Sequence, residues 1–146
     1  MKIYLDMCSF NRPYDDQTYI KIKLEAEAKL FIQREVKEGR LKLAWSYILE
    51  FENEDNPYKE RRETIESWID LAFIDVEPSE SILKQAEALE KKGIKADDAL
   101  HIACAISAKC DYFITTDYKL IKKAVTLNQI HVMNPVDYIR ILEDKK

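Results

Sequence analysis

Four acidic residues lie at the ends or starts of predicted structural elements, where they could bind a divalent metal ion together: Asp6, Glu50, Asp98 and Asp117. Carboxylates gathered in one place repel each other and resist full ionisation. A hard cation removes that penalty, and Mg²⁺ and Mn²⁺ prefer oxygen ligands. Such a metal lowers the pKa of a bound water and orients it toward a phosphodiester. The acids therefore predict metal-assisted hydrolysis.

Five short runs rich in β-branched and aromatic residues predict buried strands. They are Ile3–Leu5, Leu41–Trp45, Phe73–Val76, Tyr112–Thr115 and Ile130–Met133. Apolar residues at helical spacing fill the segments between them, so strands and helices alternate. This alternation predicts an α/β fold, with a central parallel five-stranded sheet and helices on both faces. We expect the 146 residues to form a single domain.

The predicted topology sends these acids to one edge of the sheet. In an open parallel sheet, sites form beyond the carboxyl ends of the strands, and the connecting helices begin at that same edge because they run antiparallel to the strands. Asp6 directly follows the first strand, where no predicted helix needs it as a cap, and Asp117 follows the fourth. Asp98 lies in the first turn of one helix, and Glu50 in a short helix that Ser46 is placed to cap.

Apart from Asp6, these acids also have a purely structural interpretation. Asp98 could interact only with the dipole of its helix, and Asp117 could be only an N-cap. Glu52 and Glu54 lie close to Glu50, and Asp97 directly precedes Asp98. Most such residues are merely solvated, so spacing alone does not choose among these alternatives.

Four segments contain these acids: KIYLDMCSFNRP, SYILEFE, KADDALHIACAI and CDYFITTDYKL. They resemble the PIN-domain family, in the family's order and across nearly the whole chain. The family pattern has an apolar strand ending in Asp, a Ser-x-x-x-Glu-Leu segment, an Asp-Ala-Leu-His-Ile-Ala helix and a strand ending in Thr-x-Asp. The resemblance selects Glu50 over Glu52 and Asp98 over Asp97.

The resemblance implies a metal-dependent ribonuclease, most often the toxin of a VapC-type toxin–antitoxin pair. In that case Asp6, Asp98 and Asp117 bind Mg²⁺ or Mn²⁺, and Glu50 completes the catalytic set. The implied partners are an RNA substrate and an antitoxin protein. These are expectations from the family, and not consequences of composition or spacing.

The position two residues after Asp6 departs from the family pattern. PIN domains often carry Asn or Ser there, where it helps to order the metal site, whereas this chain has Cys8 followed by Ser9. A thiol is a poor ligand for Mg²⁺, so either Ser9 or a backbone group substitutes, or the site is weaker. This departure and the net charge of −4 motivate an alternative function. It is a catalytically weak or inactive PIN scaffold that binds RNA or a protein partner.

Three further residues are candidates for binding the substrate: Asn11, Arg12 and Thr116. Asn11 and Arg12 lie on a segment with no regular hydrophobic pattern, which is predicted to be an irregular loop. Arg12 could contact a phosphate bidentately. An ion pair with Asp15 or Asp16 is the favoured alternative for its side chain.

Composition excludes several classes of protein. Hydrophobic residues make up 47% of the chain, which is enough for a core without disulfides or structural metals. The net charge of −4 counts against a large DNA-wrapping surface.

No P-loop, GxGxxG motif or nucleophile elbow is present. The cysteines, Cys8, Cys104 and Cys110, show no CxxC spacing, and we expect free thiols in a reducing cytoplasm. No stretch approaches the ~20 apolar residues that span a membrane.

Two further features each allow two interpretations. One is the long helix after the first strand, and the other is the histidine on the helix that leads into the fourth strand. The helix predicted over residues 16–38 carries Ile22 and Leu30 off its main apolar stripe. This broad surface packs either beneath the protein's own second helix or against a second copy, and we expect a homodimer. His101, one turn after Asp98, is expected to be a core or hydrogen-bonded residue rather than a catalytic base.

Overall fold

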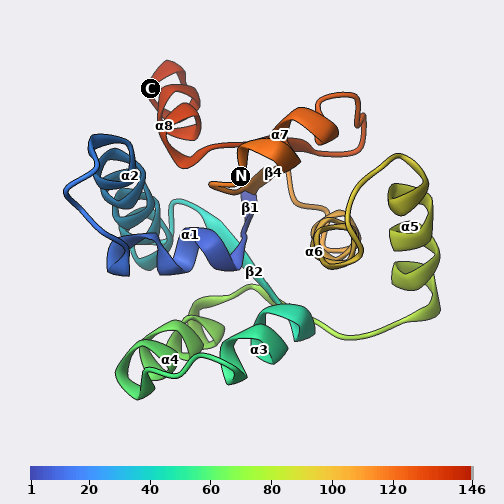
Figure 1. Cartoon of the computed structure of the whole chain (residues 1–146), viewed down its shortest axis with the longest axis horizontal. Helices are drawn as coiled ribbons and strands as arrows, with labels where there is room; N and C mark the ends of the chain where they lie inside the picture. The colour runs from blue at the N-terminus through green and yellow to red at the C-terminus, as the bar shows by residue number, and fades with distance from the viewer. Residues whose placement is uncertain (146) are drawn as a thin grey trace.

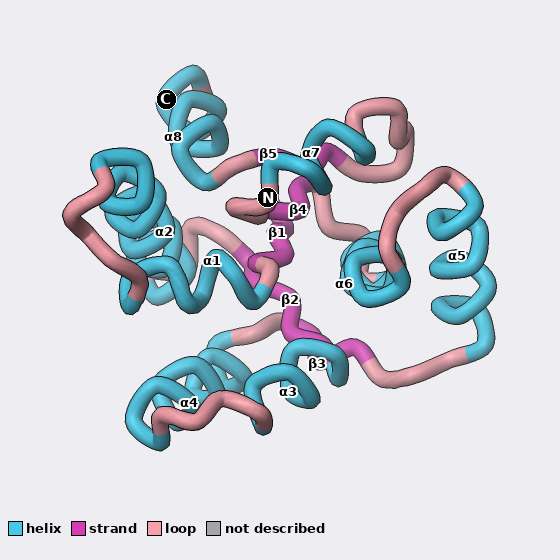
Figure 2. Tube along the Cα trace, in the orientation of Figure 1, coloured by secondary structure: helices cyan, strands magenta, loops and turns pink. Residues whose placement is uncertain are grey.

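A computed structural model describes residues 1–145 and contains one five-stranded sheet, drawn in magenta in Figure 2. All strands are parallel, and their order is β3-β2-β1-β4-β5. The strands are β1 (Lys2–Leu5), β2 (Lys42–Ser46), β3 (Ile74–Val76), β4 (Tyr112–Ile114) and β5 (His131–Met133). Each lies within one residue of its predicted bounds. The predicted α/β fold with a central parallel sheet is therefore confirmed.

Within residues 1–145, eight α-helices and two short 3-10 helices join the strands. The α-helices are α1 (Met7–Asn11), α2 (Ile20–Lys37), α3 (Tyr47–Glu54), α4 (Lys59–Glu66), α5 (Glu80–Lys91), α6 (Ala96–Ser107), α7 (Tyr118–Ala124) and α8 (Pro135–Asp144), and the 3-10 helices are η1 (Arg12–Tyr14) and η2 (Ser67–Leu71). Figure 1 shows α1, α2 and α8 on one side of the sheet and α5 and α6 on the other. None of the described helices is long and apolar enough to cross a membrane.

The central strand β1 is the most deeply buried part of the sheet. Ile3, Tyr4 and Leu5 are fully buried, because β1 pairs with β2 on one side and β4 on the other while helices cover both faces. Phe10 of α1 packs against Trp45 of β2, with their ring centroids 5.6 Å apart. These contacts fix the start of α1 relative to the sheet.

The chain changes direction along the sheet between β1 and β4. From β1 it adds β2 and then β3 on one side, and it later adds β4 and β5 on the other. Open α/β sheets bind ligands at such a switch point, beyond the carboxyl ends of the strands. Here Leu5 pairs with Ile114, and the backbone N–H of Asp6 donates to the Ile114 carbonyl over 2.9 Å. The residues that follow β1 and β4 therefore meet.

The segment after Asp6 is more regular than predicted. It forms α1 and then η1, where we expected an irregular loop. Ser9 helps to hold it in place, because its buried hydroxyl donates to the Ile114 carbonyl over 3.1 Å. Helix α1 is short and of mixed polarity, so the sequence shows no helical pattern there. The hydrogen bond that supports it comes from a residue 105 positions away in the chain.

We predict that Phe10→Ala lowers the free energy of unfolding by about 3–5 kcal/mol, because it leaves a cavity beside Trp45. Phe51→Ala is the matched control: its side chain is 67% exposed, and we expect a change within about 0.5 kcal/mol. Urea unfolding followed by circular dichroism measures both. Equal stability of the two variants would contradict the packing of α1 on the sheet.

Candidate metal centre

Asp6 is a nearly buried carboxylate that several donors hold in one orientation. It is 7% exposed. Its Oδ1 accepts the Met7 N–H over 2.8 Å, while its Oδ2 accepts the Thr115 hydroxyl over 3.0 Å and the Cys8 thiol over 3.4 Å. Asp6 thus caps α1, a helix that the sequence did not reveal. The same carboxylate can still offer oxygen lone pairs to a ligand, because each oxygen accepts more than one bond.

Thr115 links Asp6 to Asp117. Besides donating to Asp6, its hydroxyl oxygen accepts the backbone N–H of Asp117 over 3.1 Å. Asp117 caps α7 through Oδ1, which accepts the N–H groups of Lys119 and Leu120 over 3.0 and 3.2 Å. Because both capping bonds use Oδ1, Oδ2 remains available to a ligand. The cap and the ligand roles of Asp117 are therefore compatible.

An open cavity of about 370 Å³ lies at this edge of the sheet. Acidic side chains dominate its lining, which comprises Asp6, Met7, Cys8, Glu52, Asp55, Asp98, His101 and Asp117. The structure thus brings together three of the four acids selected from the sequence. Asp98 lies in the cavity wall, whereas its neighbour Asp97 is exposed and lies outside it.

Glu50, the fourth predicted acid, lies elsewhere. It lines a different cavity with Trp45 and Arg62, and Glu52 takes its place beside Asp6. The reason is helical geometry: side chains two residues apart on an α-helix point about 160° away from each other. Leu49 and Asn53 form the buried face of α3, and the two glutamates flank it on opposite sides. We therefore replace Glu50 by Glu52 in the candidate site.

A signal for Glu52 was present in the sequence. It follows Ile48 by four residues and Leu49 by three, so it continues the apolar face of α3, whereas Glu50 lies off that face. The Ser-x-x-x-Glu spacing favours Glu50, whereas the apolar face of α3 favours Glu52. The direction of the helix faces is the better criterion here.

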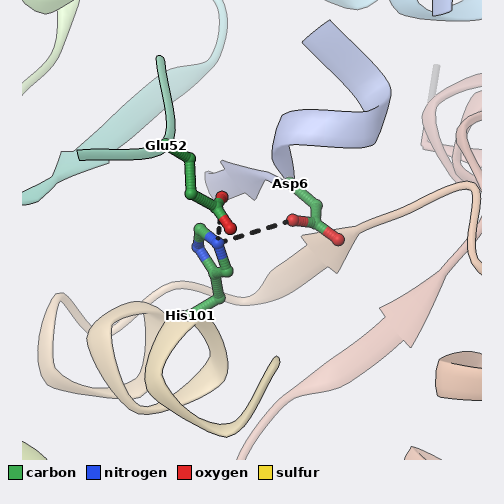
Figure 3. Close-up of side chains that lie close together, drawn as sticks. All are labelled: Asp6, Glu52 and His101. Carbon is green, nitrogen blue, oxygen red and sulfur yellow. Dashed lines mark hydrogen bonds and ion pairs between the residues drawn. The ribbon is translucent and has the colours of Figure 1, made fainter. Parts of the chain in front are cut away.

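His101 is buried and hydrogen-bonded through both ring nitrogens. Its Nε2 lies 2.6 Å from Glu52 Oε1, and its Nδ1 lies 2.6 Å from the Tyr4 hydroxyl, which in turn lies 2.6 Å from Ser46 Oγ. Figure 3 shows Glu52 and His101 pointing toward each other beside Asp6. Burial opposes the charged imidazolium, but the Glu52 hydrogen bond and the surrounding acids outweigh it and raise the pKa of His101. His101 therefore donates to Glu52 and positions it.

Electrostatic repulsion is evident at Asp98. Burial, together with the charges of Asp6 and Asp117, raises the pKa of the Asp98 carboxyl to about 6. His101 and Lys95 offset this effect only in part. The cavity thus carries more negative charge than its surroundings compensate, as expected for a site that binds a cation.

The donor set fits a hard divalent metal. One ligand atom from each of Asp6, Glu52 and His101 lies within 4.8 Å of the others, and Asp98 and Asp117 line the same cavity. Since both nitrogens of His101 already have hydrogen-bond partners, the carboxylate oxygens are the available ligands. An oxygen-only set suits Mg²⁺ or Mn²⁺.

Cys8 supports Asp6 as a hydrogen-bond donor. Burial and the Asp6 charge raise the pKa of the Cys8 thiol to about 12, so it remains protonated near neutral pH. Its sulfur also accepts the Thr116 N–H over 3.4 Å, which ties it to the end of β4. Ser9 does not replace it at the cavity, because its hydroxyl is directed to the Ile114 carbonyl. The thiol thus orders Asp6 without acting as a metal ligand.

The three candidate substrate-binding residues differ in their surroundings. Arg12 forms ion pairs with Asp15 over 3.0 Å and with buried Glu25 over 3.1 Å, in agreement with the favoured alternative. Asn11 lines an adjoining cavity. Thr116 is buried, and its backbone N–H is the group that contacts Cys8. Contact of any of these residues with substrate stays a prediction.

The sequence profile of the PIN domain matches residues 11–125, most of the chain. The chain belongs to the PIN-domain family. The match runs from the end of α1 to the end of α7, and so includes Glu52, Asp98 and Asp117. Asp6 precedes the matched region in sequence but lies in the same cavity. No curated protein sequence matches this PIN domain.

Two solved structures share its fold. VapBC-1 from nontypeable Haemophilus influenzae contains a chain that is 20% identical, with a TM-score of 0.57. VapBC2 from Rickettsia felis, bound to a DNA fragment from their promoter, contains one that is 18% identical, with a TM-score of 0.54. Each alignment covers 92% of this chain and 98% of the other. At these identities, the likeness shows a common fold.

We predict that Asp98→Asn stabilises the metal-free protein by about 1 kcal/mol at pH 7–8. The folded pKa of about 6 lies above the ordinary 3.8, so the folded state binds this proton more tightly than the unfolded chain. The free energy of unfolding therefore falls as the pH rises from about 4 to 6, and the loss is complete above that range. We keep the magnitude small because the half-buried carboxyl is screened by water.

Thermal and urea unfolding in EDTA measure this effect, with Asp97→Asn as the exposed control from the same helical turn. The control should leave stability nearly unchanged. Added Mn²⁺ should stabilise the wild type more than Asp98→Asn, because only binding to the folded state raises stability. A destabilised Asp98→Asn variant in EDTA would contradict the repulsion inferred here.

Proposed function

We propose that this PIN domain is a divalent-metal-dependent endoribonuclease that hydrolyses RNA with Mg²⁺ or Mn²⁺, and that it is the toxin of a type II toxin–antitoxin pair. The observation that carries this proposal is the cavity at the switch point. Asp6, Glu52, Asp98 and Asp117 come from separate segments, yet all line that cavity. Asp6 and Asp117 also cap helices, but gathering several carboxylates in one cavity adds repulsion that a bound cation would offset.

In this proposal, Asp6, Asp98 and Asp117 hold the metal, and Glu52 completes the catalytic set. When bound, the metal supplies an activated water and offsets the charge that develops on the leaving oxygen. The protein's own part is orientation: Thr115 and Cys8 fix Asp6, while His101 fixes Glu52. The open cavity leaves room for the phosphodiester beside these oxygens.

The proposed partners follow from the same fold. Both similar structures are VapBC assemblies, which supports an antitoxin as a partner of this chain. Exposed apolar side chains on and before α2 support a homodimer: Tyr19, Ile20, Leu24 and Leu30. The three cysteines are free thiols, which supports the reducing cytoplasm as the location.

We predict that the purified protein cleaves single-stranded RNA in Mn²⁺ and that EDTA abolishes the cleavage. Asp6→Asn should reduce the rate by at least about 10²-fold, because a neutral amide binds the cation more weakly than a carboxylate. Gel analysis of labelled RNA measures the rate. Cleavage that persists at the wild-type rate in Asp6→Asn would reject the proposed metal site.

Calorimetry with Mn²⁺ separates the nuclease from the inactive scaffold. Metal binding that Asp6→Asn weakens, together with RNA cleavage, supports the enzyme. A wild-type protein that binds no Mn²⁺ at millimolar concentration and leaves RNA intact would favour the scaffold, which binds RNA or a protein without cutting it.

The two glutamates of α3 provide a matched pair. We predict that Glu52→Gln lowers the cleavage rate at least about tenfold, because it removes a carboxylate from the cavity and weakens its bond with His101. Glu50→Gln makes the same chemical change outside the cavity and should retain the wild-type rate. The opposite result would restore Glu50 to the catalytic set.

A further inference from the structure

A second cavity, of about 360 Å³, adjoins the metal cavity. Both cavities are lined by Met7, Glu52 and Asp55, so they share a wall. The second one is bounded on its far side by Tyr58 and Arg61, near the start of α4. A chain-like ligand with one group in the metal cavity can therefore place its next group here.

An aromatic and cationic platform forms this far side. The Arg61 Cζ atom lies 4.0 Å from the centroid of the Tyr58 ring and 4.7 Å from that of Tyr14. Tyr14 belongs to η1, and Figure 1 shows the chain after α1 lying beside α4. The Tyr58 side chain is 56% exposed, so part of its ring remains open to a ligand. Arg–aromatic pairs are common on protein surfaces, and this one is set apart by its position beside the acidic cavity.

The loop that carries Tyr58 is held by its own hydrogen bonds. The Tyr58 N–H donates to Asn56 Oδ1 over 3.1 Å, and Arg62 donates to the Asn56 carbonyl over 3.0 Å. Asn53 in turn donates to the Arg62 carbonyl over 2.9 Å. These bonds involve the Tyr58 backbone and not its ring. The fold thus holds the backbone of Tyr58 in place and leaves its ring, which contacts Arg61, outside the core.

We propose that this second cavity binds an unpaired nucleobase of the RNA substrate, stacked on Tyr58 and Arg61, while a neighbouring phosphate lies in the metal cavity. The proposal rests on the nuclease function proposed above. Every base presents a π-face, and stacking on aromatic rings and guanidinium groups is a general mode of single-strand recognition. A cavity with a cationic aromatic wall and no other cation in its lining suits a neutral base better than a second phosphate.

The remaining wall favours one base. Its polar side chains are mostly carboxylates and amides, among them Asn11, Asp15 and Asp55, whose oxygens accept hydrogen bonds. Guanine offers two adjacent donors, N1–H and the N2 amino group, which a single carboxylate can accept together. We therefore expect guanine to bind better than uracil, which offers only one N–H.

The test measures binding without cleavage. The probe is a short fluorescein-labelled RNA of uridines with one central guanosine, followed by fluorescence anisotropy. It is added to the protein in Ca²⁺, a hard cation that takes oxygen ligands and offsets the charge of the acidic cavity, and a gel verifies that the probe stays intact. We expect Tyr58→Ala to weaken binding about tenfold, the effect of losing one stacked base. Tyr58→Phe keeps the ring and should bind like the wild type.

Phe73→Ala is the surface control, because Phe73 is also a partly exposed ring beside a cation, with Lys2 Nζ 5.3 Å from its centroid. Phe73 directly precedes β3, at the amino ends of the strands, whereas the metal cavity lies at their carboxyl ends. This variant should bind RNA normally. Replacing the guanosine by uridine should weaken binding to the wild type but hardly affect Tyr58→Ala, because a base that is not stacked on Tyr58 is not held where the carboxylates can accept its N–H groups.

The outcomes separate this proposal from the nuclease function. Unchanged binding by Tyr58→Ala, equal weakening by Tyr58→Phe, or no binding by the wild type would each overturn the nucleobase site. Cleavage in Mn²⁺ is scored separately: a wild type that binds the probe through Tyr58 but never cleaves RNA rejects only the nuclease. Thermal unfolding verifies that each variant is folded.

Discussion

The hydrogen bonds that join the ends of β1 and β4 are the constraint on which the site depends. The Asp6 N–H donates to the Ile114 carbonyl, and the Thr115 hydroxyl donates to the Asp6 carboxylate. Because β1 is the buried central strand, neither end can move without disturbing the core. The rest of the acidic cavity is assembled around this junction, with Asp117 held to it through Thr115.

A site made of carboxylates has to keep its side chains ordered while they repel each other. The structure does so with neutral or positive donors placed behind the acids: Cys8 and Thr115 behind Asp6, and His101 behind Glu52. Such partners orient ligands and preserve their charge. Burial, and after it the charges of Asp6 and Asp117, raise the pKa of Asp98, so these donors compensate the repulsion only in part.

The polar cavity and the aromatic platform divide two tasks between neighbouring surfaces. Carboxylates at the sheet edge suit a cation and a phosphodiester, whereas the ring of Tyr58 and the guanidinium of Arg61 suit a base. The acidic net charge fits this division, since a metal reverses the local sign and stacking requires no broad basic surface. The two cavities share a wall that includes Glu52, so the proposed phosphodiester and base sites adjoin each other.

Hydrophobic periodicity and the connection rules of α/β folds are local or topological, so the order of elements, the parallel sheet, and the placement of Asp6, Asp117 and the Asp97–Asp98 pair at one edge follow from the sequence. The choice of Asp98 over Asp97 came from the resemblance to the PIN-domain family. The choice between Glu50 and Glu52 depends on how α3 is rotated against the sheet. The family spacing favours Glu50, whereas the apolar face of α3 favours Glu52, and the structure places Glu52 in the cavity. The tertiary structure also revealed the His101 hydrogen bonds and the capping of α1 by Asp6. The His101 bonds join residues far apart in the chain, and α1 is supported by the bond of Ser9 to Ile114, so no local pattern encodes either feature.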